Sequence, residues 1–249
     1  MRTIAISNQK GGVGKTTSTI NIGAGLAQLG KRVLLIDMDP QANLTYSLGI
    51  IAHELENTVY ELLRGESQFE KIRIERNGFD VIPSTLDLSG AEIEFSGLPG
   101  REYLLQETIA KVNDYDYILI DCPPSLGILT LNSLTTAQEI WIPLQTEFLP
   151  MYGISKLIQT VEIVQKRLNQ NLDISGIICT RFDGRKNLNK EVVEKLREHF
   201  GEKVFKSMIR ENISLAEAPS YGQTIFEYKP KSNGAEDYLN LCKELILRG

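Results

Sequence analysis

A short glycine-rich stretch carries the residue types in this chain that are best suited to chemistry. It reads Lys10-Gly11-Gly12-Val13-Gly14-Lys15-Thr16-Thr17. Glycines let a backbone turn its N–H groups inward around a phosphate without Cβ clashes. Lys15 would then contact the β- and γ-phosphates of a nucleotide, and the Thr16 hydroxyl would bind Mg²⁺. We therefore expect the stretch to bind nucleotide phosphates, with a glycine-rich turn of no chemical role as the alternative.

Acidic residues follow two of the apolar runs. Asp37 and Asp121 end the runs 32–37 and 117–121, and Asp39 comes two residues after the first of them. Continuous apolar runs are typical of buried parallel strands, and ligands bind at the carboxyl ends of such strands. Acids beside a phosphate loop would repel the ligand unless they hold Mg²⁺ or position a water molecule. The alternative is that Asp37 and Asp39 cap the helix that follows them.

These residues need a sheet that brings the ends of several strands together. Apolar runs predict strands at 4–6, 32–37, 79–83, 117–121, 139–143 and 172–180. Periodicity and capping signals predict helices after the glycine-rich stretch and at 58–63, 102–112, 154–168, 188–200 and 238–248. This alternation predicts one α/β domain over residues 1–249, a doubly wound, mostly parallel sheet with helices on both faces. Three glycines and a proline in 89–101 predict a mobile loop there.

The composition limits the compartment and the partners. The hydrophobic fraction is 42%, and the formal net charge is -5, so any contact with a polyanion must come from a local basic patch. Cys122, Cys179 and Cys242 are widely spaced, which favours reduced thiols over disulfides or a metal site. The chain shows neither a signal peptide nor an apolar run of the roughly 20 residues that span a membrane. We expect a cytoplasmic protein and, because the first strand starts at about Thr3, no N-terminal DNA-reading domain.

The glycine-rich stretch departs from the standard phosphate-binding pattern in one informative way. That pattern has a glycine six residues before Lys15, where this chain has Gln9, and a second lysine, Lys10, opens the loop instead. This deviant Walker A form resembles the ParA/MinD group of P-loop ATPases. The Asp-x-Asp-Pro-Gln segment at 37–41 and the Asp-x-Pro-Pro segment at 121–124 resemble the second and third motifs of that group, in the same order.

This resemblance implies a P-loop NTPase fold with ATP and Mg²⁺ as ligands. Asp39 would polarise the attacking water, Asp37 would lie in the outer shell of Mg²⁺, and Asp121 would be the Walker B acid. Lys10 would contact the phosphates that are bound by the partner subunit of a dimer. The catalytic set would be Lys10, Lys15 and Asp39. The metal site would comprise Thr16, Asp37 and Asp121.

The region 209–222 also resembles ParA relatives but differs at one turn. Where relatives commonly have Ile-Pro-Arg-Asn-Val-Arg, this chain has Ile209-Arg210-Glu211-Asn212-Ile213-Ser214. Arg210 replaces the proline beside the adenine, and Glu211 and Ser214 remove positive charge where relatives hold DNA. The nucleotide would be contacted, beyond the loop, by Arg181, Arg210 and Asn212. DNA would be contacted by Arg185, Lys186 and Arg210. The alternative for these basic residues is a solvated surface of mixed charge.

Over nearly its whole length the chain resembles ParA/Soj-type partition ATPases. The resemblance implies a weak Mg-dependent ATPase whose ATP-bound homodimer binds non-specific DNA of the nucleoid. A ParB-like or other adaptor on a plasmid, chromosome origin or large protein body would stimulate hydrolysis.

The main alternative is a MinD-like membrane-associated ATPase, which needs a C-terminal helix rich in Lys and Arg. Residues 238–248 contain only two basic residues, so we expect that helix to pack on the protein's own core and no membrane partner. An electron-transfer ATPase with bridging cysteines and a scaffold that binds ATP without hydrolysis are further alternatives.

Overall fold

A seven-stranded sheet forms the centre of the molecule. The computed structural model describes residues 1–146 and 150–248. The strands are β1 (Arg2–Ile6), β2 (Val33–Asp37), β3 (Ile74–Arg76), β4 (Phe79–Ile82), β5 (Tyr117–Asp121), β6 (Glu139–Gln145) and β7 (Asp173–Thr180). Their order in the sheet is β3-β4-β2-β5-β1-β6-β7, and only β3 is antiparallel to its neighbour. The predicted doubly wound α/β domain is therefore confirmed, with β3 as an unpredicted edge strand.

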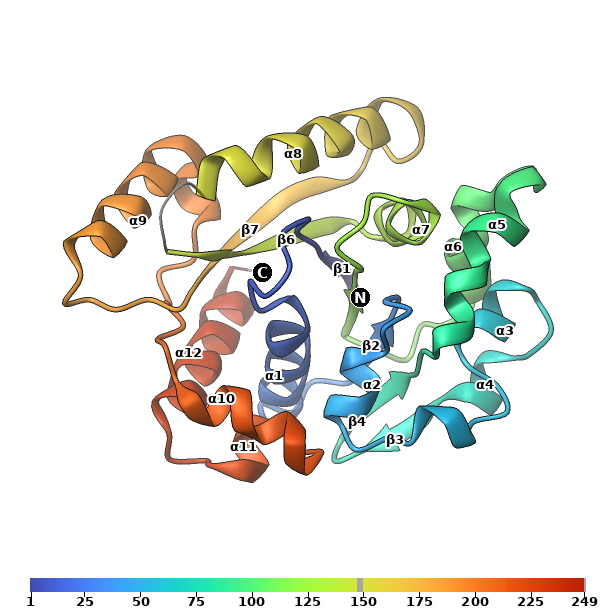
Figure 1. Cartoon of the computed structure of the whole chain (residues 1–249), viewed down its shortest axis with the longest axis horizontal. Coiled ribbons are helices and arrows are strands. Elements are labelled where there is room, and N and C mark those ends of the chain that lie inside the picture. Colours follow the sequence, from blue (N-terminus) through green and yellow to red (C-terminus); the bar gives the residue numbers. More distant parts are fainter. Residues whose placement is uncertain (147–149, 249) are drawn as a thin grey trace.

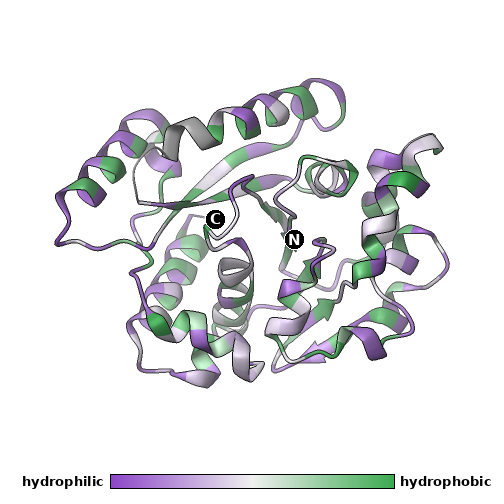
Figure 2. Cartoon of the chain, in the orientation of Figure 1, coloured by the Kyte–Doolittle hydropathy of each residue, from purple (hydrophilic) through white to green (hydrophobic). Residues whose placement is uncertain are grey.

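Helices cover both faces of this sheet (Figure 1). They are α1 (Lys15–Gln28), α2 (Asn43–Ser47), α3 (Val59–Leu63), α4 (Phe69–Ile72), α5 (Ala91–Glu94), α6 (Leu104–Ile109), α7 (Ile128–Thr136), α8 (Pro150–Arg167), α9 (Asn187–Phe200), α10 (Ile213–Glu217), α11 (Ile225–Tyr228) and α12 (Asn233–Leu247). α1, α2, α11 and α12 contribute to the core on one face, whereas α3 and α5 to α9 contribute to the core on the other. The outer helices α8 and α9 alternate between hydrophobic and hydrophilic residues, as expected for helices with one buried side (Figure 2).

Alternate residues of each central strand enter the two cores. In β2, Val33 and Leu35 pack under α1 and α12, while Leu34 and Ile36 face the opposite core. All four side chains are at most 1% exposed. A strand that is buried on both sides cannot show polar alternation, which is why continuous apolar runs identified the central strands.

The register of the sheet places the acids beside the glycine-rich loop. Asp37 of β2 pairs with Asp121 of β5, and Asp121 also pairs with Ile6, the last residue of β1. Because the strands are parallel, all three carboxyl ends lie at the same edge of the sheet. The loop after Ile6 therefore begins next to Asp121, and Asp37 lies one strand further along the sheet.

The segment 89–101 differs from the predicted loop. It contains α5 and 3₁₀ turns at Leu86–Gly90, Phe95–Gly97 and Arg101–Tyr103. Leu88, Ala91 and Phe95 are buried in the core, so apolar residues at helical spacing anchor this segment despite its glycines. The helix predicted at 102–112 is also shorter, because regular α-helix covers only α6, Leu104–Ile109.

Strand β6 extends two residues beyond the predicted end at Pro143. Its pairing with β1 stops at Trp141, whereas its pairing with β7 continues to Gln145. Pro143 is tolerated here because only one side of the strand still needs backbone N–H donors. The sequence-based prediction ended the strand at the proline and so missed Gln145.

The C-terminal helix packs on the protein's own core, as predicted. Tyr238, Leu241, Cys242 and Leu245 of α12 are all at most 1% exposed and belong to the same core as α1. Within residues 1–146 and 150–248, no helix is both long and apolar enough to cross a membrane.

Candidate nucleotide site

The loop between β1 and α1 adopts a shape that glycine permits. Gly12 and Gly14 have φ angles of 72° and 92°, in the left-handed region that residues with a Cβ rarely adopt. Gly14 is the N-cap of α1, so the helix starts at Lys15 and its unpaired N–H groups face the loop. Side chains from neighbouring strand ends hold the loop carbonyls: Gln145 donates to Gly12 O at 2.7 Å, and Thr180 donates to Val13 O at 2.9 Å.

The two lysines of the loop lie in different surroundings. Lys15 is 8% exposed and lines a cavity, whereas Lys10 is exposed. Lys15 Nζ donates to Lys10 O at 3.5 Å, and within the described residues it forms no ion pair. An almost buried ammonium without an acid partner is a strong site for an anion. The cavity beside Lys15 can therefore accept a phosphate group.

Asp37 is completely buried, and both of its oxygens accept hydrogen bonds. Oδ1 accepts from Asp39 N at 3.1 Å, and Oδ2 accepts from Thr45 N and Thr45 Oγ1 at 3.0 and 2.8 Å. Burial raises its pKa to about 6, although the bonds from Thr45 and Asp39 oppose the shift. Asp37 therefore fixes the start of α2 and has little remaining capacity for a direct ligand.

Asp39 and Asp121 retain free acceptor capacity. Asp39 is 7% exposed, lines the cavity and accepts from Gln41 N through Oδ1 at 2.9 Å. Asp121 is completely buried and its Oδ1 accepts from Thr19 at 3.2 Å. Its Oδ2 has no hydrogen-bond partner among residues 1–146 and 150–248. Burial raises the pKa of Asp121 to about 8, and the charge of nearby Asp37 adds to the shift.

This donor set fits Mg²⁺. A buried carboxylate oxygen without a partner is costly unless a cation or a proton compensates it. Hydroxyl and carboxylate oxygens are the ligands that Mg²⁺ prefers. Asp121 and Thr16 have these groups at the loop, and the hydroxyl of Thr16 lies near enough to lower the pKa of Asp121.

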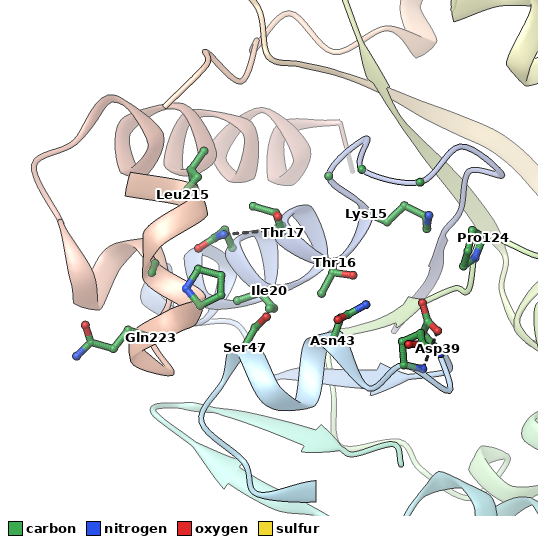
Figure 3. Close-up of a pocket in the computed structure, with 17 residues that line it drawn as sticks. Lys15, Thr16, Thr17, Ile20, Asp39, Asn43, Ser47, Pro124, Leu215 and Gln223 are labelled. Atoms are coloured by element: carbon green, nitrogen blue, oxygen red, sulfur yellow. Dashed lines mark hydrogen bonds between the residues drawn. The ribbon is translucent and has the colours of Figure 1, made fainter. Parts of the chain in front are cut away.

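Two cavities flank the loop. The first, of about 390 Å³, lies between the loop, α2 and the α10 region (Figure 3). Asn43 and Ser47 form one wall, and Leu215 and Gln223 form the other. The second cavity, of about 280 Å³, lies between the loop and the segment 209–216; it is lined in part by Arg181, Arg210 and Asn212, the three residues predicted to contact the nucleotide beyond the loop. Structure thus brings these residues together around one continuous loop.

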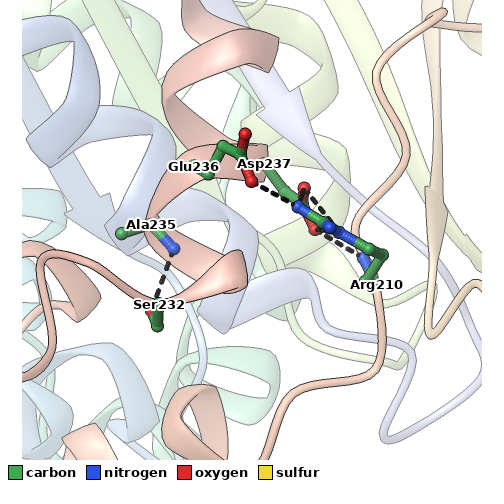
Figure 4. Close-up of polar contacts among 5 residues, drawn as sticks. All are labelled: Arg210, Ser232, Ala235, Glu236 and Asp237. Carbon is green, nitrogen blue, oxygen red and sulfur yellow. Dashed lines mark hydrogen bonds and ion pairs between the residues drawn. The ribbon is translucent and has the colours of Figure 1, made fainter.

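The guanidinium of Arg210 is engaged by two acids. It bonds Asp237 at 2.6 Å and Glu236 at 2.7 Å, and its backbone N–H also donates to Asp237 (Figure 4). Hydrogen bonds to Asp237 and then Glu236 raise the pKa of Arg210. Arg210 therefore joins the wall of the second cavity to α12, and much of its charge is compensated.

Arg185 and Lys186 lie outside both cavities. They occupy the connection between β7 and α9, and both side chains are exposed. Arg185 forms an ion pair with Asp183 at 2.9 Å. The Arg185 side chain is 91% exposed, although that of Asp183 is only 15% exposed. The guanidinium can therefore exchange Asp183 for another anion.

Four residues that support the site were absent from the sequence-based set: Gln145, Thr180, Thr45 and Ser84. Gln145 and Thr180 end β6 and β7, so the rule that found Asp37 and Asp121, polar residues at the carboxyl ends of strands, could have found them. Thr45 and Ser84 are joined by a hydrogen bond from Ser84 N to Thr45 Oγ1. No sequence signal identifies that pair because its partners are far apart in the chain.

A glycine-rich loop that starts a helix beside two strand-terminal acids defines a P-loop NTPase. Residues 1–174 match a family described as an AAA domain. The chain is 48% identical over 249 residues to the sporulation initiation inhibitor protein Soj of Bacillus subtilis, covering 99% of this chain and 98% of Soj. It is 44% identical to the chromosome partitioning protein ParA of Caulobacter vibrioides, covering 100% of this chain and 95% of ParA.

Solved structures agree with this assignment. Cobyrinic acid a,c-diamide synthase from Mycobacterium smegmatis, with bound ADP and magnesium, is similar with a TM-score of 0.87 and 36% identity, covering 99% of this chain and 94% of that one. The cell division ATPase MinD of Pyrococcus furiosus has a TM-score of 0.81 and 27% identity, covering 100% and 99% of the two chains. The chain belongs to the ParA/Soj family of chromosome-partitioning ATPases. It is an ATPase that uses ATP and Mg²⁺, as the sequence predicted.

Proposed function

We propose that this ATPase is a dimerisation switch, in which ATP closes a homodimer and hydrolysis opens it. The observation that carries the proposal is the different burial of the two lysines of one loop. Lys15 is buried in the cavity, whereas Lys10 is exposed and free of any acid partner among the described residues. A cation on the outside of a phosphate loop is suited to a second phosphate group, which a partner subunit would present.

The chemistry follows from the groups around the first cavity. The phosphates of ATP would lie against the loop N–H groups and Lys15, and the base would occupy the second cavity. Asp39, with one free oxygen, would orient the attacking water. Mg²⁺, held by Thr16 and Asp121 with Asp37 behind them, would neutralise charge on the phosphates. Lys10 from the partner subunit would stabilise charge on the transferred phosphoryl group, as arginine fingers do for about 10³ to 10⁵ in rate.

We further infer that the ATP-bound dimer binds DNA without sequence preference and positions a cargo in the cytoplasm. The support is the family itself, since the relatives are named chromosome partitioning proteins. Exposed Arg185 and Lys186 supply the phosphate contacts, with Arg210 contributing less because Asp237 and Glu236 compensate its charge. An adaptor protein bound to the cargo would stimulate hydrolysis and release the dimer locally. The cargo would be a chromosome origin, a plasmid or a large protein body.

DNA binding in each nucleotide state tests this function. Binding to a random-sequence duplex is measured across a salt series with ATP and with ADP, using the Asp39→Ala variant to prevent turnover. We expect binding with ATP only, with a logarithmic salt slope that falls by about 1 for each phosphate contact removed. Arg185→Glu should weaken binding at least about tenfold, whereas Lys111→Glu, an equal charge reversal outside the β7–α9 connection, should not. Equal binding with ATP and ADP would contradict the switch, and no binding at low salt would remove DNA from it.

A further inference from the structure

Gln145 touches both the phosphate loop and the exposed lysine. It is the last residue of β6 and is 8% exposed. Its Nε2 donates to Gly12 O at 2.7 Å, and its Oε1 accepts from Lys10 Nζ at 3.3 Å. One amide thus uses its donor on the loop backbone and its acceptor on the lysine.

A second amide fixes the backbone on which Lys10 sits. Asn8 Oδ1 accepts from Lys10 N at 3.0 Å, and Asn8 Nδ2 donates to Pro143 O at 2.8 Å. Pro143 and Gln145 lie on the same strand, so β6 holds the start of the loop at two points. The Lys10 side chain then has one hydrogen-bond acceptor among the described residues, the Gln145 amide oxygen.

The geometry points to Gln145 as a positioning residue that retains Lys10 in its own subunit until ATP and a partner subunit compete for it. This inference rests on the proposed dimerisation, in which Lys10 must leave its own subunit's surface to reach the partner. Lys15 must also leave Lys10 O, which it contacts at 3.5 Å, when it turns to a phosphate. Both loop lysines therefore bond acceptors of their own chain, which a phosphate group would replace.

Gln145 is uncharged, which suits a hydrogen bond to Lys10 that must break when the dimer forms. A carboxylate here would form an ion pair with Lys10 and would also repel the phosphates beside Gly12. An amide oxygen accepts a weaker hydrogen bond from the lysine ammonium than a carboxylate does, and the amide N–H can still donate to the Gly12 carbonyl. An apolar residue would free Lys10 but leave Gly12 O without its donor.

Two substitutions of Gln145 with opposite expected effects distinguish retention of Lys10 from simple support of the loop. Both are made in Asp39→Ala protein at saturating ATP, and dimerisation is measured by sedimentation equilibrium. Gln145→Glu should lower the association constant about tenfold or more, by holding Lys10 more tightly. Gln145→Leu should raise it several-fold, because Lys10 no longer has an acceptor to leave. Gln138→Glu, the same charge change directly before β6, keeps the acceptor for Thr3 N and should leave dimerisation unchanged.

Loss of dimerisation in both Gln145 variants would overturn the inference, since Gln145 would then only support the loop. The affinity for ATP reports the contact between Gln145 and Gly12 O separately. It is measured with a fluorescent ATP analogue, at protein concentrations too low for dimers to form. ATP affinity should fall for both variants, with Lys10 in place and in Lys10→Ala protein alike. It should fall further for Gln145→Glu, because the carboxylate repels the phosphates.

Lys10 itself gives a readout that does not depend on the dimer. Trace acetylation of nucleotide-free protein, followed by mass spectrometry, measures how freely each lysine amine reacts, with exposed Lys111 as the internal reference. Lys10 should react several-fold faster in Gln145→Leu than in the unaltered protein, and unchanged reactivity would overturn the inference. If Asp39→Ala protein with unaltered Gln145 fails to dimerise with ATP, the proposed switch falls, while faster acetylation in Gln145→Leu still supports the hold on Lys10.

Discussion

Asp37 and Asp121 are completely buried acids at the carboxyl ends of the neighbouring strands β2 and β5. Burial raises the pKa of both carboxyl groups, and the charge of Asp37 raises the pKa of Asp121 further. Asp37 accepts two hydrogen bonds from Thr45, whereas Asp121 Oδ2 has no partner in the part of the chain that the structure describes. The fold therefore buries a carboxylate oxygen that is suited to a Mg²⁺ ligand.

Replacing Asp121 tests whether this residue supports activity at a cost in stability. Asp121→Asn removes an ionisable group from a buried site, so we expect the nucleotide-free protein to gain about 1–3 kcal/mol. For a chain of this size, that corresponds to a rise in melting temperature of roughly 2–4 °C per kcal/mol. Phosphate release should fall about 100-fold or more, because the carboxylate no longer supports the metal.

Asp116→Asn is the matched control, since this half-exposed acid directly before β5 forms an ion pair with Arg32 at 3.2 Å. Its melting temperature and turnover should change little. A fall in the melting temperature of Asp121→Asn would contradict the view that Asp121 is kept for function at the expense of stability.

At the scale of elements, the short helix α2 positions the segment between β2 and α2 that contains Asp39. Thr45 of α2 donates to Asp37 through both its backbone N–H and its hydroxyl, and the hydroxyl accepts from Ser84 N after β4. Ser84 Oγ then donates to Asp39 O at 2.9 Å. Two strand ends and one helix are thus joined in a buried chain of hydrogen bonds, whose members position Asp39 together.

Breaking one link of this chain should disturb the others. Thr45→Val keeps the shape but removes the hydroxyl, so Asp37 loses a donor and Ser84 N–H loses its acceptor. We expect the free energy of unfolding to fall by about 1–3 kcal/mol in urea titrations. Turnover should fall roughly tenfold, because misplaced catalytic groups are costly even when all remain present.

Thr45→Ser retains the hydroxyl and should recover most of both losses. If Thr45→Ser loses stability and turnover while Thr45→Val keeps both, packing of the threonine methyl group, not the hydrogen-bond chain, positions α2.

For the whole molecule, the open cavity and exposed Lys10 mean that one subunit holds only part of the proposed catalytic machinery. The first cavity is bounded by the loop, α2 and the α10 region, and exposed Lys10 lies at the loop beside it. A symmetric pair of chains would place each Lys10 near the other subunit's phosphates, so nucleotide and assembly would be coupled.

Light scattering with defined nucleotides tests this coupling. Asp39→Ala should remain dimeric with Mg²⁺ and ATP, because it binds but does not hydrolyse, and should become monomeric with ADP. Removing Mg²⁺ with EDTA should dissociate the dimer, because the phosphate charges are then uncompensated. Lys10→Ala combined with Asp39→Ala should stay monomeric while retaining ATP. A stable dimer of that double variant would show that Lys10 does not hold the two chains together.

Local sequence was sufficient for the phosphate loop, the strand-terminal acids, the central parallel strands and the packing of α12. These features follow from short-range physics: glycines that permit positive φ, acids that end apolar runs, and apolar periodicity that matches burial. The element boundaries that were predicted wrongly lie where tertiary packing outweighs local preference. In the region of 89–101, the buried side chains of Leu88 and Phe95 anchor helical turns despite the glycines.

Only the tertiary structure decided which distant residues meet at the loop. Arg210 meets Asp237 and Glu236, Thr45 meets Asp37 and Ser84, and Gln145 meets Lys10 across 135 positions of sequence. The sequence by itself determined that this chain is an ATPase with a deviant P-loop motif, because that motif lies within one contiguous segment. The hold on its exposed lysine depends on the register of β6 against β1 and β7, which the folded sheet alone specifies.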